Sequence, residues 1–357
     1  MYGNTLNTAD AGIRVVSSKV DLSEASFGAF VTYFGTTGNG GHAVAVFGDG
    51  MLRSMPLDDD PKTMKDTPEV GNGAMALSGA PDTDGLGTLF GTDDGRLLRF
   101  RPGEGLEELA SVPGKWIENV AMSAEAGLSA FSAGLDVLVQ DADGATVAVL
   151  ASHPSTPTGI AFAPDGNRLA VSRYDGVSVW RLDDTSVPEE LHWHGSHTAL
   201  SWSPDGRFIV TAMQENELHC WRMPDGKDMK MSGYPSKIRA LSWTPDSAYL
   251  AASGAGTVTS WCCAGDGPSG KAPQEFGYVY EGTVTRVAAR PAGHVVAGGY
   301  DDGTVMIGDI DGGGAIIARA GDGGAITALS WSPDGGTLLA GGADGAVAVI
   351  RVLEAIA

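Results

Sequence analysis

A proline-containing motif recurs along this chain at nearly constant spacing, and it constrains the possible folds more than any other feature. Four copies consist of a short apolar segment followed by Pro-Asp-Gly or Pro-Asp-Ser, and a weaker fifth copy contains Pro291. The prolines stand at positions 164, 204, 245, 291 and 333, so successive copies are 40, 41, 46 and 42 residues apart. A period of this length indicates that one structural unit is repeated and that each copy packs against its neighbours.

Each copy predicts short strands joined by tight turns. Proline fixes its own φ angle and has no amide proton for a strand ladder, so the first strand should end there. The Asp-Gly that follows suits a tight turn into a second strand. A further turn, such as Asp175-Gly176, leads into an alternating third strand, and a weaker fourth strand follows, as at residues 147–150.

These repeats resemble the WD-repeat β-propeller family, whose unit has about 40–45 residues and four strands. The resemblance covers approximately residues 27–352 and is carried by the Ser-Pro-Asp-Gly copies and by the third-strand tryptophans Trp180, Trp221 and Trp261. Two family features are weak. Eleven residues before each proline, only His153 supplies the usual histidine, and no aspartate follows the three tryptophans. The buried polar network of the family is therefore expected to be largely replaced.

The turns between second and third strands predict the number of units. We expect them at residues 49–50, 94–95, 133–134, 175–176, 215–216, 255–256, 302–303 and 344–345. The prediction is an all-β fold: a single closed β-propeller of four-stranded antiparallel blades, with eight blades preferred and seven as the alternative.

The last unit ends after three strands, so a segment near the N-terminus should complete it. The apolar residues Ile13–Val16 are the expected closing strand, because pairing there would remove an exposed sheet edge. Residues 1–26 are thus expected to form an N-terminal segment within the same domain as the propeller of residues 27–357. Loops at 58–69 and 265–273 are expected to bulge from the ring.

The charge, the apolar runs and the cysteine content of the chain indicate which classes of partner and which cellular compartment to expect. The chain has 23 Lys and Arg against 44 Asp and Glu, a formal net charge of −21, which argues against nucleic acid or an anionic membrane surface as the main partner. No apolar run is long enough for a membrane helix, so membrane insertion is not expected. Three cysteines, two of them adjacent, and an N-terminus without signal-peptide features predict a cytoplasmic protein.

Catalytic motifs give little support for an enzyme. The sequence contains no G-x-S-x-G, H-E-x-x-H or C-x-x-C, and its Asp-Gly pairs are explained by turns. Residues 265–271 have the spacing of a phosphate-binding loop, but Ala272 and Pro273 follow where Ser or Thr and a helix are needed. We therefore interpret this segment as a loop between strands. A hydrolase site assembled in the central channel stays open as an alternative.

Two clusters could hold a metal. His192, His194 and His197 lie within six residues and could ligate a transition metal, although the segment also fits a structural loop between units. Cys220, Cys262 and Cys263 offer softer ligands, but their position at the ends of third strands suits buried small residues better. The prediction is no metal and no cofactor, with the three histidines kept as alternative ligands for a metal or a small molecule.

The remaining candidates lie at the predicted rim of the ring, before the first strands and at the second-to-third-strand turns. Tryptophan, tyrosine and arginine dominate binding hot spots, and basic residues are scarce in this chain. The predicted partner-binding residues are Trp116, Arg173, Tyr174, Lys237, Arg239 and Tyr300. The leading hypothesis is a non-enzymatic scaffold that presents one propeller face to a protein partner.

Overall fold

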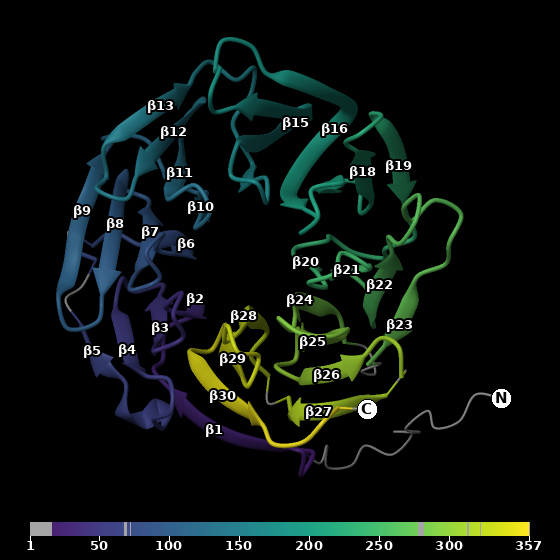
Figure 1. The fold of residues 1–357 in the computed structure, drawn as a ribbon. Helices are drawn as coiled ribbons and strands as arrows, with labels where there is room; N and C mark the ends of the chain where they lie inside the picture. Colours follow the sequence, from purple (N-terminus) through teal and green to yellow (C-terminus); the bar gives the residue numbers. More distant parts are fainter. Residues whose placement is uncertain are drawn as a thin grey trace.

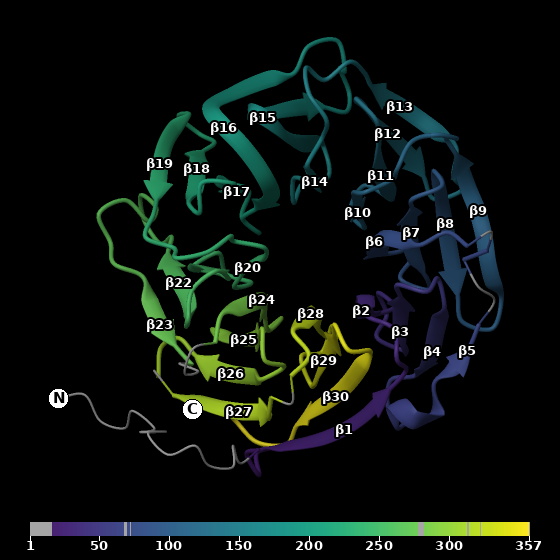
Figure 2. The same cartoon turned by 180° about the vertical axis from the view of Figure 1, so that it is seen from behind.

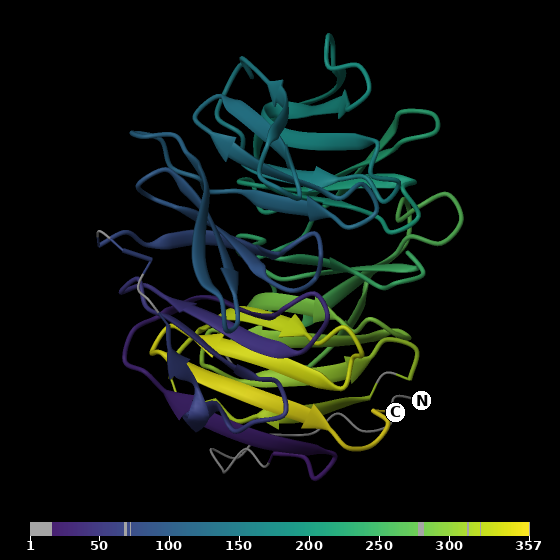
Figure 3. The ribbon, with the colours of Figure 1, turned by 60° about the vertical axis from the view of Figure 1, so that its left-hand side comes forward.

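The computed structural model describes residues 16–356 apart from 68–69, 72, 278–281, 313 and 322. Its β-sheets stand around a central axis, with their innermost strands facing that axis (Figure 1). Figure 3 shows how neighbouring sheets stack face against face around the ring. The all-β prediction of a single closed β-propeller is confirmed.

In the described part of the chain, seven hydrogen-bonded antiparallel sheets make up the ring, and chain order follows the ring. The first three comprise β2 Val31–Thr36, β3 His42–Phe47, β4 Leu52–Pro56 and β5 Lys65–Asp66; β6 Ala76–Pro81, β7 Thr88–Thr92, β8 Arg96–Arg101 and β9 Gly105–Ser111; and β10 Val120–Ser123, β11 Leu128–Ala133, β12 Asp136–Asp141 and β13 Thr146–Leu150. The fourth comprises β14 Gly159–Phe162, β15 Arg168–Arg181, β16 Glu189–Trp202, β17 Phe208–Met213, β18 Leu218–Arg222 and β19 Lys227–Met231.

The last three sheets comprise β20 Leu241–Trp243, β21 Tyr249–Ala252, β22 Val258–Cys262 and β23 Gln274–Phe276; β24 Val284–Ala289, β25 Val295–Tyr300, β26 Val305–Asp309 and β27 Ala315–Arg319; and β28 Ile326–Trp331, β29 Thr337–Gly342, β30 Ala346–Val352 and β1 Val20–Ser26. A short 3₁₀ helix, η1 Pro61–Thr63, interrupts the loop between β4 and β5. The long loop between β22 and β23 contains the segment 265–273 and projects from the ring (Figure 1).

The count of seven sheets reflects a six-stranded sheet that two repeat units share. The first half of β15 pairs with β14 and its second half with β16, while the second half of β16 pairs with β17. Leu182 N donates to Asn167 O, so the two halves of β15 fold back on each other as a second and a third strand. The structure therefore has seven sheets, the predicted alternative, instead of the preferred eight. Seven of the eight predicted second-to-third-strand turns separate two strands, and residues 175–176 lie within β15, where Asp175 has a φ angle of 65°.

The ring is closed by a strand near the N-terminus, as predicted, but the segment differs. β1 pairs with β30 over seven residues, from Val20 opposite Val352 to Ser26 opposite Ala346. Figure 2 shows β1 running along the outer edge of β30. The proposed segment Ile13–Val16 is wrong for this role: residues 13–15 lie outside the described residues, and Val16 packs against the core without entering a strand. β1 carries neither the Pro-Asp-Gly motif nor a tryptophan of the repeat, so the comparison of repeats did not identify it.

The Pro-Asp-Gly motifs form the turns that the sequence predicts. Gly166, Gly206 and Gly335 have φ angles of 68°, 71° and 68°, which glycine adopts without a Cβ penalty. Each amide closes the turn on the residue three positions earlier, as in Gly206 N to Ser203 O at 2.9 Å. These turns lie at the end of each sheet opposite the second-to-third-strand turns, because successive strands are antiparallel.

The first-strand tryptophans belong to the core between sheets. Trp202, Trp243 and Trp331 are 7%, 9% and 8% exposed, so they are unavailable for stacking on bases or ligands. Trp202 Nε1 donates to Ala161 O and Trp331 Nε1 donates to Ala288 O, each on the preceding unit. Burial of these large side chains between neighbouring units supplies much of the hydrophobic stabilisation of the ring.

The position eleven residues before each motif proline fixes the third-strand tryptophan in two units. Trp180 Nε1 donates to His153 Nε2 at 3.1 Å, and Trp261 Nε1 donates to Tyr234 Oη at 2.7 Å. Tyr234 thus replaces the histidine as the acceptor. In the unit between them the position holds Trp193, which stacks on His219 with ring centroids 3.9 Å apart. The expected network is replaced by other contacts rather than lost.

Replacing Tyr234 tests whether its hydroxyl is the hydrogen-bond acceptor that holds Trp261. Tyr234→Phe leaves the buried Trp261 Nε1 without its acceptor and should lower the free energy of unfolding by about 1–2 kcal/mol. Tyr234→His should recover most of that loss, since His153 serves Trp180 at the same repeat position. Urea denaturation followed by tryptophan fluorescence measures both values. Equal stability of the Phe variant and wild type would contradict the role given to this bond.

Among the residues that the structure describes, no helix is long and apolar enough to cross a membrane.

Candidate interaction face

One end of the ring carries both the second-to-third-strand turns and the segments that enter each innermost strand. We call this end the turn face and define it by the turns at 48–51, 93–95, 133–135, 174–176, 214–216, 253–256, 301–303 and 343–345. Backbone hydrogen bonds tie the entering segments to these turns, as in Gly48 N to Phe30 O, Gln214 N to Ser196 O and Asp301 N to Thr283 O. The loops of this face are therefore held by the sheets beneath them.

Acidic residues in these turns accept hydrogen bonds from backbone amides. Asp49 Oδ1 accepts a hydrogen bond from Met51 N, Asp93 Oδ1 from Met75 N, and Asp301 Oδ1 from Thr283 N. Asp94 pairs with Arg96 at 2.8 Å. Carboxylates bonded in this way hold the turns, which agrees with their interpretation as turn residues and not as an acid–base pair.

An apolar patch on the turn face consists of Trp116, Leu135 and Tyr174, which are 61%, 46% and 50% exposed. Lys115 Nζ donates to Ala133 O, so the loop of Trp116 lies against the turn of Leu135. The segment that contains His153 and Ser155 joins Leu135 to Tyr174. His153 N donates to Leu135 O, and Tyr174 N donates to Ser155 Oγ. Large exposed apolar groups close together are typical of binding surfaces.

A pocket of about 430 Å³ opens beside this patch. Its lining residues come from the loop before β10, the turn before β12 and the loop before β14: Lys115, Gly134, Leu135, Asp136, Ser152 and His153. Among them His153 is buried, with Nδ1 hydrogen-bonded to Leu135 O and Nε2 accepting from Trp180 Nε1. Burial lowers the pKa of His153, so its imidazole is neutral at physiological pH. The sequence predicted Trp116 and Tyr174 but missed Leu135, because a lone leucine in a turn carries no signal.

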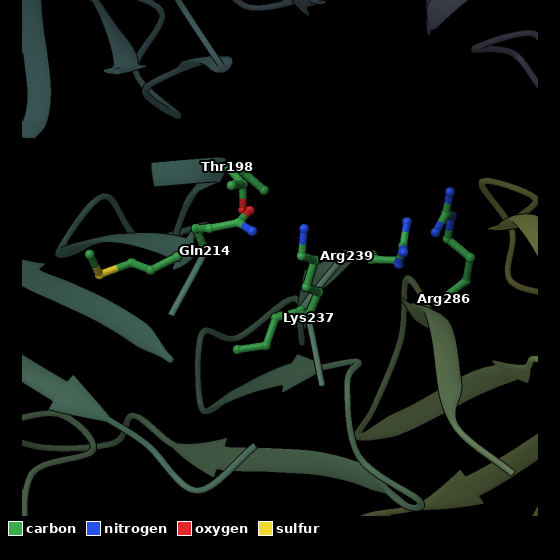
Figure 4. A pocket seen from close by; sticks show the side chains of 8 residues that line it. Thr198, Gln214, Lys237, Arg239 and Arg286 are labelled. Atoms are coloured by element: carbon green, nitrogen blue, oxygen red, sulfur yellow. The ribbon is translucent and has the colours of Figure 1, made fainter. Parts of the chain in front are cut away.

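A second pocket, of about 340 Å³, lies where three neighbouring units meet the central axis. It is lined by Thr198, Ala199, Met213, Gln214, Lys237, Ile238, Arg239 and Arg286. Figure 4 shows the Lys237, Arg239 and Arg286 side chains extending in the same direction from adjacent loops and strands. Lys237 and Arg239 are exposed, and their role in binding a partner stays a prediction. Arg286 was missed, since the repeat comparison selected positions eight and six residues before the proline and Arg286 is five before Pro291.

Two predicted partner-binding residues are buried, so their placement on an exposed rim is wrong. Arg173 is 4% exposed; its guanidinium donates to Ser178 Oγ and Tyr174 O and forms an ion pair with Glu190. It holds the two halves of β15 to β16. The pairing of β15 with β16 shifts in register between Tyr174 and Gly176, so inward-pointing and outward-pointing side chains do not alternate regularly here.

Tyr300 is fully buried. Its ring packs among the side chains of neighbouring sheets, and its hydroxyl donates to Gly277 O on the loop after β23. Burial raises the pKa of Tyr300, so the phenol keeps its proton. A tyrosine just before a turn can therefore point into the core, where the carbonyl of an adjacent loop satisfies its hydroxyl.

The structure does not bring the three candidate metal-ligating histidines together. His197 is buried, with Nδ1 bonded to Thr211 Oγ1 at 2.7 Å and Nε2 to Trp193 O at 3.0 Å. His194 points into solvent beside Asp175, at 2.9 Å, and His192 is exposed. Within the described part of the chain, no three His, Cys, Asp or Glu side chains gather closely enough to hold a metal ion.

The cysteines also belong to the core. Cys220 and Cys263 are fully buried in one cluster between the fifth and sixth repeat units, and Cys262 is half-buried. Burial raises the pKa of the Cys263 thiol to about 12 and that of Cys220 well above its usual range. Protonated thiols are poor metal ligands and poor nucleophiles. This agrees with their interpretation as buried small residues.

Comparison with known proteins places the repeats among WD-repeat sequences. Residues 155–246 match the family model of the anaphase-promoting complex subunit 4 WD40 domain, and residues 317–350 match the WD domain, G-beta repeat. A chromatin assembly factor 1 subunit FAS2 homolog from Oryza sativa subsp. japonica is 30% identical over 111 residues. That match covers 29% of this chain and only 22% of the relative.

Solved structures share the fold over nearly the whole ring. The C-terminal WD40 domain of Sif2 superposes with a TM-score of 0.74 at 14% identity, covering 96% of this chain and 99% of that one. The computationally designed Ika8 protein gives a TM-score of 0.73 at 21% identity, covering 92% and 98%. At such identities these likenesses concern the fold alone.

Proposed function

The chain belongs to the WD-repeat β-propeller family, and from that premise we propose that it is a non-enzymatic scaffold whose turn face binds a protein partner. The observation that carries the proposal is the coincidence, on one face, of the apolar patch Trp116, Leu135 and Tyr174 with the exposed cations Lys237 and Arg239. Aromatic and cationic side chains of this kind dominate protein-binding hot spots.

The rigidity of the face supports this role. The entering loops are hydrogen-bonded to the turns and their strands are buried on both sides, so a partner would meet preorganised groups with little loss of conformational entropy. No catalytic role is included, because the turn carboxylates are bonded to backbone amides and the buried His197 is bonded through both ring nitrogens.

A comparison of two surface variants tests the proposal. The face variant combines Trp116→Ala, Leu135→Ser and Tyr174→Ala. The control combines Leu86→Ser and Val187→Ser, which remove exposed apolar groups of 54% and 77% exposure from loops at the other end of the ring. Proteins recovered with each tagged variant from the native cell extract are quantified by mass spectrometry against wild type.

We expect one or a few proteins to fall at least tenfold with the face variant and to stay at wild-type level with the control. Circular dichroism and thermal unfolding verify that both variants are folded. Equal recovery with the face variant, or loss only with the control, would remove the turn face as the binding surface.

A further inference from the structure

Three basic side chains in the 340 Å³ pocket lack the carboxylate partners that most arginines of this chain have. Among the described residues, ten arginines form ion pairs with Asp or Glu: 53, 96, 99, 101, 168, 173, 181, 207, 222 and 319. In contrast, no carboxylate of the described residues lies within ion-pair distance of Lys237, Arg239 or Arg286, and none lines their pocket. This is unexpected in a chain of net charge −21.

The geometry fixes these cations near one another. Arg286 is half-buried; Nε donates to Thr327 O at 2.8 Å and Nη1 to Thr285 O at 3.0 Å, which holds its guanidinium toward the pocket. Arg239 N donates to Ser253 Oγ and Ser236 N to Gly254 O, so the loop that carries Lys237 and Arg239 is anchored to a turn. Burial and the charge of Arg239 lower the pKa of Arg286, which indicates that the two guanidinium groups repel each other.

The rest of the lining suits a short side chain that ends in a carboxylate. Met213, Ile238 and Ala199 provide apolar surface, and the amide of Gln214 lies beside the cations (Figure 4). A guanidinium can bind a carboxylate through two parallel hydrogen bonds, and such pairs are stronger than neutral ones. An anion placed between Arg239 and Arg286 would also relieve their repulsion.

We propose that this pocket binds an acidic side chain, such as glutamate, on the segment of the partner protein that enters the central axis of the ring. The inference rests on the proposed function, because it assumes a protein partner on the turn face. It narrows that partner to one with an exposed acidic segment. The carboxylate would pair with Arg239 and Arg286, with Lys237 at the rim and the methylene groups of the ligand against Ile238.

A synthetic peptide tests the pocket without the native partner. The probe is a heptapeptide of alternating glycine and glutamate with a neutral BODIPY label, and its glutamine counterpart is the uncharged comparison. Binding is measured by fluorescence anisotropy for the whole chain at fixed ionic strength. The variants are Arg239→Gln with Arg286→Gln, and Lys237→Gln with Arg239→Gln. The second pair leaves the backbone bonds of Arg286 intact in case its replacement disturbs the fold.

The control removes the same charge elsewhere. Arg181→Gln with Lys227→Gln takes two exposed cations from the periphery of the ring. We expect saturable binding of the glutamate peptide to wild type and to the control, and at least tenfold weaker binding to both pocket variants. The glutamine peptide should bind at least tenfold more weakly to wild type. Adding inorganic phosphate as competitor measures the affinity of the pocket for a simple anion.

Several results would overturn the inference: no binding of the glutamate peptide, equal binding to wild type and the pocket variants, or equal binding of the glutamine peptide. Phosphate that competes as strongly as the peptide would show a simple anion site instead of an acidic-segment site. If the peptide experiment fails but the face variant that includes Trp116→Ala still loses its partner, the acidic-segment site is rejected and the turn face stays the binding surface. If the glutamate peptide binds as expected but the face variant recovers its partners at wild-type level, the pocket is an anion-binding site and the proposed scaffold role of the turn face is rejected.

Discussion

Deleting residues 1–26 should destabilise the whole ring, lowering the free energy of unfolding by at least about 3 kcal/mol. The deletion removes β1 and its seven residue pairs with β30, together with the buried Val20. It also breaks the ion pair of Glu24 with the buried Arg319, at 2.6 Å. The outer edge of β30 would then have no strand beside it.

An unpaired strand edge invites pairing with other chains. We therefore expect the deleted protein to associate, which light scattering after size-exclusion chromatography would detect, and to unfold at lower urea concentration. The control deletes only residues 1–15 and leaves β1 intact. If the two deletions were equally stable and equally monomeric, closure of the ring by Val20–Ser26 would not contribute as the structure indicates.

Acidification should destabilise the protein well above the pH at which carboxylates are protonated. His219 is fully buried between Trp193 and Trp221, and its two ring nitrogens have no hydrogen-bond partner among the described residues. Burial lowers the pKa of His219 from 6.5 to about 4. It also lowers the pKa of His153 and of His197. All three histidines must therefore stay neutral for the native packing to persist.

The direction of the effect follows from proton binding. Between pH 6.5 and 4 the unfolded chain binds a proton at His219 that the folded chain excludes, so stability falls as the pH falls through this range. From pH 7.5 to 5 this residue should account for about 2 kcal/mol of lost stability. His294 acts in the opposite sense, since Asp246 and Asp311 raise its pKa and its protonated form stabilises the fold. The large lowering of the pKa of His219 sets the direction of the net effect.

Urea unfolding at pH 7.5 and 5 measures the effect, and His219→Phe isolates its main source. Phenylalanine preserves the stacking on Trp193 but cannot be protonated, so the difference in stability between the two pH values should shrink by about 2 kcal/mol. His192→Gln, which removes an exposed histidine, is the control. An unchanged difference in the His219 variant would show that His219 is protonated in the folded protein.

Much of the fold was predictable because its turns need special residues. Pro164, Pro204, Pro245 and Pro333 end first strands. Gly166, Gly206 and Gly335, and Ser247 after Pro245, then supply positive φ angles, so periodicity and turn chemistry agree along most of the chain. The closing strand was placed too early because β1 carries no repeat motif, while Ile13–Val16 is a more continuous apolar run. The sharing of one sheet by β15 and β16 depends on a hydrogen-bond register that the sequence does not specify.

The site was only partly predictable because repeat position gives the location of a residue along a strand but not the direction of its side chain. Trp116, Tyr174, Lys237 and Arg239 are exposed as predicted. Arg173 is turned inward by its ion pair with Glu190 from the adjacent strand, which no local pattern reports. Leu135 and Arg286 join the face only through the packing of neighbouring units.

Hydrogen exchange of the protein bound to a partner recovered through the turn face tests whether this face is the binding surface. We expect slower amide exchange on binding at residues 112–119, 133–136, 174–176 and 236–240, all on the turn face. The Pro-Asp-Gly turns at the other end of the ring, near Gly166, Gly206 and Gly335, should exchange at the rate of the free protein. Protection confined to those Pro-Asp-Gly turns would instead place the binding surface on the opposite end of the ring.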